Sequence, residues 1–168
     1  MKCEICDSCF AKAIAAENAV QTYYEKMAEY FNHVPQLHEF LTQMSLDEFK
    51  HAESLHESRK AEFHSDKIHA ETRKMERHLD SIIGDVHTSS KKPPTSFDEV
   101  YSFAHEIENA ELNSIFIFLT TEAMTYEGDT LGFMMVAMET HIQKVNQLTS
   151  LFDRAKMKTI FPSVKYSI

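Results

Sequence analysis

The sequence predicts an all-α protein whose main domain is a four-helix bundle, and three observations support this prediction. Glycine and proline are scarce, at 3 and 4 of 168 residues, whereas Ala, Glu, Lys, Leu and Met are common, as expected of helices rather than of strands and tight turns. Apolar residues recur at alternating steps of three and four through four long segments, which places them on one face of a helix. A chain of this length can also bury a hydrophobic core.

The first two segments predict two helices joined by a short connection. The first, from about Phe10 to Phe31, aligns Ala13, Glu17, Val20, Tyr24 and Met27 on one face. The second follows Pro35, which suits the first turn of a helix because the N–H that it lacks would have no partner there. This segment aligns Leu37, Leu41, Met44, Glu48, His51 and Leu55.

The last two segments predict a second pair of helices. The third runs from about 96 to 118, after the break Lys91-Lys92-Pro93-Pro94, and aligns Tyr101, Ala104, Glu108, Glu111, Ile115 and Phe118. The fourth follows Glu127-Gly128-Asp129 and aligns Met134, Met138, His141, Val145, Leu148 and Phe152. Both breaks are typical of turns.

The connection between the second and third helices, about residues 57–96, is too long for a hairpin loop. It can cross the length of the bundle, so we expect the third helix to run parallel to the second. Met75, Leu79 and Ile82 predict that part of this crossover is itself helical. We therefore divide the chain into a cysteine-containing segment (1–9), the bundle (10–155) and a C-terminal tail (156–168).

The net charge and the lack of long apolar stretches exclude some classes of binding partner. The formal net charge of -9 argues against nucleic-acid binding, which requires a basic face. No apolar stretch approaches the length of a membrane span, and the start MKCEICDSC lacks the apolar core of a signal peptide. We expect a cytoplasmic protein that does not associate with membranes.

The candidate functional residues are acids on otherwise apolar helix faces, namely Glu17, Glu48, Glu108 and Glu111. Burying them unpaired would cost several kcal/mol each, so such a cluster requires protons or bound cations. His51 and His141 lie on the same faces and would complete a nitrogen and oxygen ligand set. That set suits iron or manganese better than calcium or a thiolate zinc site.

Each of these residues alone is more often an acid at the rim of a core or a hydrogen-bonded core histidine, and one Glu-x-x-His pair, as in Glu48 and His51, is weak evidence. Their order across four helices is what favours a di-metal site. The two halves of the chain also repeat: Glu17-Asn-Ala recurs as Glu108-Asn-Ala, and His51 recurs as His141. This repeat predicts two helical hairpins related by a pseudo-twofold axis.

On these motifs, the chain resembles the rubrerythrin branch of the ferritin-like superfamily from about Phe10 to Phe152. The motifs are Glu17 with Tyr23-Tyr24, Glu48-Phe-Lys-His51-Ala-Glu and Glu108-Asn-Ala-Glu111. The resemblance implies a ferritin-like four-helix bundle with a long crossover between helices 2 and 3. It also implies a di-iron centre that reduces hydrogen peroxide or is oxidised by oxygen. The implied metal ligands are Glu17, Glu48, His51, Glu108 and Glu111, with Tyr24 as a hydrogen-bonding neighbour in the catalytic set.

The fourth helix departs from the family pattern, which has Glu-x-x-His where this chain has Met138-Glu139-Thr140-His141. In a regular helix Glu139 and His141 cannot both face the axis. A π-bulge would turn Glu139 inward; otherwise Glu111 could substitute. We keep both His141 and Glu139 as candidate ligands.

The cysteines at positions 3, 6 and 9 are the only ones in the sequence, so the paired motifs of a rubredoxin domain are missing and an external electron donor would be needed. These cysteines could form a partial metal or redox site, but we favour reduced thiols on a frayed terminus because a fourth ligand is lacking.

The function that the sequence predicts is a cytoplasmic di-iron oxidoreductase that reacts with peroxide or oxygen, with manganese or zinc as alternative metals. A non-catalytic metal-binding or iron-handling protein is the main alternative, and a metal-free helical interaction domain is the third. Because bundles of this kind often pair, we also expect a homodimer.

Overall fold

The computed structural model describes the backbone of residues 4–60, 69–92, 94, 97–122, 136 and 140–148. Side chains are described over the same ranges except 4–6, 69–72 and 111–122. Apart from turns such as residues 31–34, the described residues are helical and include no strand, which confirms the all-α prediction. The four long helices are α1 (Glu4–Tyr30), α2 (Pro35–Arg59), α3 (His69–Ser89) and α4 (Phe97–Glu122). Residues 140–148 are also helical.

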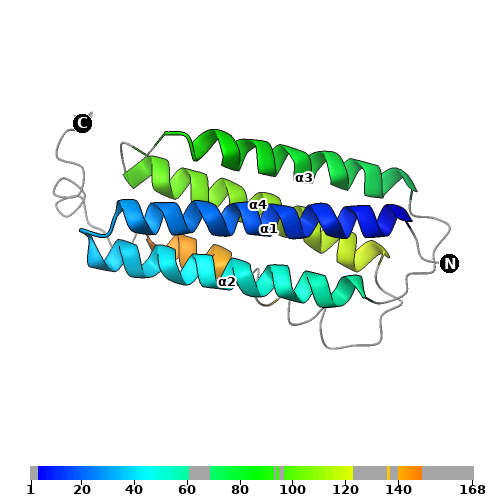
Figure 1. Ribbon diagram of the computed structural model, residues 1–168, viewed down its shortest axis with the longest axis horizontal. Coiled ribbons are helices and arrows are strands. Elements are labelled where there is room, and N and C mark those ends of the chain that lie inside the picture. Colours follow the sequence, from blue (N-terminus) through cyan, green and yellow to red (C-terminus); the bar gives the residue numbers. More distant parts are fainter. Residues whose placement is uncertain are drawn as a thin grey trace.

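The helices lie side by side with their axes close to one common direction (Figure 1). α1 packs against both α2 and α3, and α3 also packs against α4. α2 and α4 run in the same direction, opposite to α1 and α3 (Figure 1). The third predicted segment, which is α4, is therefore parallel to the second, as the long connection required. The helix expected within that connection is α3, and it buries Met75, Leu79 and Ile82.

α1 begins earlier than the apolar pattern indicated, at Glu4 instead of about Phe10. Cys9 and Phe10 are fully buried in the core, so the boundary placed between residues 9 and 10 falls inside one helix. Asp7 and Ser8, which directly precede this buried pair, are polar and partly or largely exposed, so the apolar pattern did not indicate the earlier start. For Cys9 the expectation of a frayed terminus is wrong, while the side chains of Cys3 and Cys6 lie outside the described residues.

α2 begins at Pro35, as predicted, with Val34 in the N-cap position. Its end is fixed to the start of α1 by Arg59, whose guanidinium donates two hydrogen bonds to the Asp7 carboxylate at 2.9 and 2.7 Å. α3 is held to α1 by an ion pair of 2.5 Å between Lys12 and Asp80. Such exposed pairs stabilise a fold by less than about 1 kcal/mol each, so the apolar faces carry most of the packing energy.

None of the described helices contains an apolar stretch long enough to cross a bilayer. The core fills the space between the helices with Tyr24, Phe31, Leu41 and Met44 among its largest members. Three glutamates and two histidines are buried within this same interior.

Candidate metal centre

Glu17, Glu48 and Glu108 are fully or almost fully buried, and so are His51 and His141. α1 supplies Glu17, α2 supplies Glu48 and His51, α4 supplies Glu108, and the helical residues 140–148 supply His141. The structure thus brings together five of the seven predicted ligands from four helical segments. Glu139 and the side chain of Glu111 lie outside the described residues.

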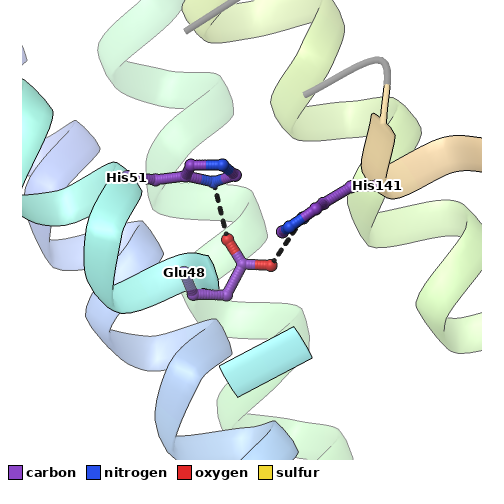
Figure 2. A group of neighbouring side chains, drawn as sticks. All are labelled: Glu48, His51 and His141. Carbon is purple, nitrogen blue, oxygen red and sulfur yellow. Dashed lines mark hydrogen bonds and ion pairs between the residues drawn. The ribbon is translucent and has the colours of Figure 1, made fainter. Parts of the chain in front are cut away.

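Glu48 is the middle of this cluster. Its Oε2 lies 3.1 Å from His51 Nδ1, and its Oε1 lies 3.2 Å from His141 Nδ1. Figure 2 shows one imidazole next to each oxygen of the carboxylate, with the two rings close to each other. The ring centroids of the two histidines are 4.5 Å apart. One ligand atom from each of these three residues lies within 4.8 Å of the others, a grouping that could hold a metal ion.

A second carboxylate contacts the same ring nitrogen of each histidine that Glu48 contacts. Glu17 Oε2 lies 3.4 Å from His51 Nδ1, and Glu108 Oε2 lies 3.1 Å from His141 Nδ1. The arrangement consists of two Glu–His pairs, one from each half of the chain, with Glu48 shared between them. This is the pairing expected from the internal repeat, except that the shared carboxylate comes from the first half alone.

Several buried polar atoms in this cluster make no hydrogen bond within the described part of the chain: both carboxylate oxygens of Glu17, Oε1 of Glu48 and Nε2 of His141. The oxygens Glu17 Oε2 and Glu48 Oε1 are within ion-pair distance of an imidazole but are not aligned with it as hydrogen bonds. An unsatisfied buried carboxylate is costly. Oxygen and imidazole nitrogen donors that converge without hydrogen-bond partners fit a bound transition metal.

The buried charges shift one another's protonation. Burial raises the pKa of Glu17 to about 8 although the nearby His51 opposes this. Burial also raises the pKa of Glu108, and the Glu48 charge adds to the effect. For Glu48 itself, burial would raise the pKa, but contacts with His141 and His51 outweigh it and hold the pKa well below its usual range. Without a metal, Glu48 is therefore the most readily ionised of the three.

The histidines shift in the opposite sense to ordinary buried imidazoles. Burial alone would lower their pKa values, but the contacts with carboxylates outweigh it. Glu17 and Glu48 raise the pKa of His51 to about 10, and Asp47, Glu108 and Glu48 raise that of His141 to about 12. Protons on the imidazoles thus supply positive charge where a metal would otherwise supply it.

Tyr24 donates a hydrogen bond of 2.7 Å from its hydroxyl to Glu108 Oε1. The residue is almost completely buried, and its ring packs edge-on against Tyr23 at 5.8 Å between centroids. This contact fixes the carboxylate of Glu108, so that its other oxygen points to His141. Tyr24 therefore occupies the neighbouring position expected from the sequence.

Sequence reasoning missed Asp47, which contacts the opposite nitrogen of His141. Its Oδ2 lies 3.4 Å from His141 Nε2 and pairs with Lys144. Its Oδ1 accepts hydrogen bonds from Lys50 at 2.8 Å and Gln43 at 3.0 Å. A carboxylate behind a ligating histidine fixes the ring and its tautomer. The signal available in the sequence was an acid adjoining the Glu48-x-x-His51 pair.

Comparison with protein-family models, with curated proteins and with solved structures gave no match for this chain.

Proposed function

We propose that this protein is a di-iron carboxylate oxidoreductase of the rubrerythrin-like type, built on a ferritin-like bundle. The observation that carries the proposal is the position of Glu48, which offers one oxygen to each of two imidazoles. The same nitrogen of each imidazole also contacts a further carboxylate. A carboxylate shared between two ligand groups is what a pair of metal ions requires.

The residues divide into two overlapping ligand groups. One would consist of Glu17, Glu48 and His51, and the other of Glu48, Glu108 and His141. Each group has at least one buried atom that lacks a hydrogen bond within the described residues, which supports a cation at both positions. Iron bound there would supply reversible one-electron oxidation and positions for peroxide or oxygen. We favour iron over manganese or zinc because of the resemblance to rubrerythrins, since the donor set suits all three.

The surrounding residues prepare the ligands for this role. Asp47 would hold the His141 ring from its Nε2 side, which keeps Nδ1 directed to the carboxylates. Tyr24 would hold Glu108 and has a hydroxyl proton within the centre. The adjoining core excludes water, which strengthens electrostatic interactions and limits side reactions. Positions 10–168 contain no cysteine, so this part of the chain has no rubredoxin-like site that could supply electrons.

The first test is anaerobic titration of the chelator-treated protein with ferrous iron, followed by peroxide. We expect about two iron ions per chain and rapid oxidation of both. Glu48→Leu should lose both ions because both positions share this residue. The exposed Glu29→Gln, on α1, is the matched control and should bind like the wild type. If the wild-type protein retains no metal after gel filtration, the proposal is wrong.

A non-catalytic metal-binding protein is the second candidate, and it is favoured by Met138, which stands where related bundles carry a fourth-helix glutamate. Loss of one ligand would weaken redox cycling while leaving metal binding intact. Turnover with peroxide and an excess of a chemical reductant separates the two functions. An oxidoreductase continues until the reductant is consumed, whereas a binding protein stops after a single oxidation of its iron.

A further inference from the structure

A surface pocket of about 250 Å³ opens onto the two histidines of the candidate centre. His51 and His141 form its inner wall, and Thr140 lies beside them. Lys50 and Lys144, from α2 and from residues 140–148, lie on either side of Asp47 in the same lining. In the described part of the chain, this pocket joins the surface to the two histidines, which in turn contact the buried glutamates.

The side chains that line this pocket include more positive than negative groups. Two ammonium groups face one carboxylate in a protein whose formal net charge is -9, so the pocket is a local exception to the acidity of the chain. Lys50 has 60% of its side chain exposed and Lys144 has 32%. Both ammonium groups are therefore reachable from solvent.

The hydrogen-bonding capacity of the pocket also favours anions over cations. Asp47 already contacts Gln43, Lys50, Lys144 and His141 through its two oxygens. A cation would therefore have to displace an existing partner. Each ammonium group has three N–H donors, and within the described residues one from each is used, by Asp47. The remaining donors are available to an incoming acceptor.

From this geometry we propose that the pocket is a binding site for small monovalent anions, through which they reach the metal centre. Its volume is below the roughly 300 Å³ at which sites for larger organic ligands begin, so the ligand class is anions of a few atoms, such as azide, nitrite or the hydroperoxide ion. Access to the metals rests on the proposed function, whereas anion binding at the two lysines does not.

Anion binding is tested on the chelator-treated protein by titration with sodium azide in a two-dimensional amide NMR experiment. We expect saturable shifts at Lys50, Thr140 and Lys144, which weaken as ionic strength rises. Lys50→Gln and Lys144→Gln should each raise the azide dissociation constant roughly two- to fivefold. Lys144→Arg, which keeps the positive charge, should have a dissociation constant close to that of the wild type. Lys12→Gln, which removes a lysine paired with Asp80 on α3, is the control and should bind azide normally. Absence of saturable shifts, or equal affinity in all variants, would overturn the anion site.

The route is tested on iron-loaded protein by the rate at which azide changes the visible absorption. With the iron content of each variant measured first, the two glutamine variants should react roughly two- to fivefold more slowly than the Lys12→Gln control at low salt. Equal rates at equal iron content would show that anions reach the metals elsewhere. If wild-type protein binds no iron, the proposed metal centre fails, while the NMR titration still decides whether the lysine site binds anions.

Discussion

Replacing Glu17 by glutamine should stabilise the metal-free protein and at the same time weaken metal binding. Burial raises the pKa of Glu17 from 4.5 to about 8, so the folded protein retains a proton that the unfolded chain releases. The favourable contribution of this protonated group is complete below pH 4.5 and is lost as the pH rises towards 8. Glutamine has nearly the same shape as the protonated acid but has no proton to lose.

The size of the effect follows from the shift. Stability falls by about 1.4 kcal/mol per pH unit while the two states differ by one proton. The free energy of unfolding of the wild-type protein therefore falls by about 3 kcal/mol between pH 4.5 and pH 7 because of Glu17. The amide must still find hydrogen-bond partners, so we expect a net gain of about 1–3 kcal/mol for Glu17→Gln. In a protein of this size that gain raises the melting temperature by roughly 3–10 °C.

The assay is guanidinium unfolding in the presence of a chelator at about pH 5, 7 and 8, with the wild type, Glu17→Gln and the control Glu29→Gln. The difference between Glu17→Gln and the wild type reports Glu17 together with its effect on the pKa of His51, whereas His141 contributes its own pH dependence to both proteins. The difference in the free energy of unfolding between Glu17→Gln and the wild type should be near zero at pH 5 and should grow as the pH rises. Glu29→Gln should have the same stability as the wild type at each pH. A Glu17→Gln variant that is less stable than the wild type at pH 8, or that has the same pH dependence, would refute the reasoning.

Three further outcomes follow from the same contacts. Asp47→Asn should lower metal affinity about 10- to 100-fold, because it removes the carboxylate 3.4 Å from His141 Nε2; chelator competition measures this, and unchanged affinity would contradict the role given to Asp47. Tyr24→Phe should destabilise the metal-free protein by roughly 1–2 kcal/mol, because the buried Glu108 Oε1 loses the donor that now lies at 2.7 Å; equal stability in denaturant would mean that water replaces the hydroxyl. Metal binding at neutral pH should release protons, because the raised pKa of His51, about 10, keeps its imidazole protonated without metal. Calorimetry in buffers of different ionisation enthalpy detects this release, and affinity should rise with pH; a pH-independent affinity would show that His51 is not a ligand.

The long helices could be predicted because each has a continuous apolar face. α2 and α4 follow breaks at Pro35 and at Pro93-Pro94, and their apolar faces extend for several turns. The start of α1 could not be placed, because Glu4, Asp7 and Ser8 interrupt the apolar pattern ahead of Cys9 and Phe10. In the fourth predicted segment, the described residues 140–148 are helical and bury His141, Val145 and Leu148, as the spacing indicated.

The acids of the site could be predicted for the same reason. Glu17, Glu48 and Glu108 interrupt apolar faces, so the helix that buries the face also buries the carboxylate. Asp47 differs, because it lies about 100° around α2 from Glu48 and contacts the centre through residues 140–148. Its partners His141 and Lys144 are almost one hundred positions away in the sequence, and no local pattern encodes such a contact.

One turn of α2 carries Asp47, Glu48 and His51 together. The rotation of α2 about its own axis decides where these three side chains point. The buried residues Leu41 and Leu55, on the same face of the helix, fix this rotation. Inserting one residue ahead of this turn would rotate all three side chains by about 100°. An insertion or deletion at this point of α2 would therefore displace all three side chains together. A point substitution, in contrast, can change one of them and leave the other two in place.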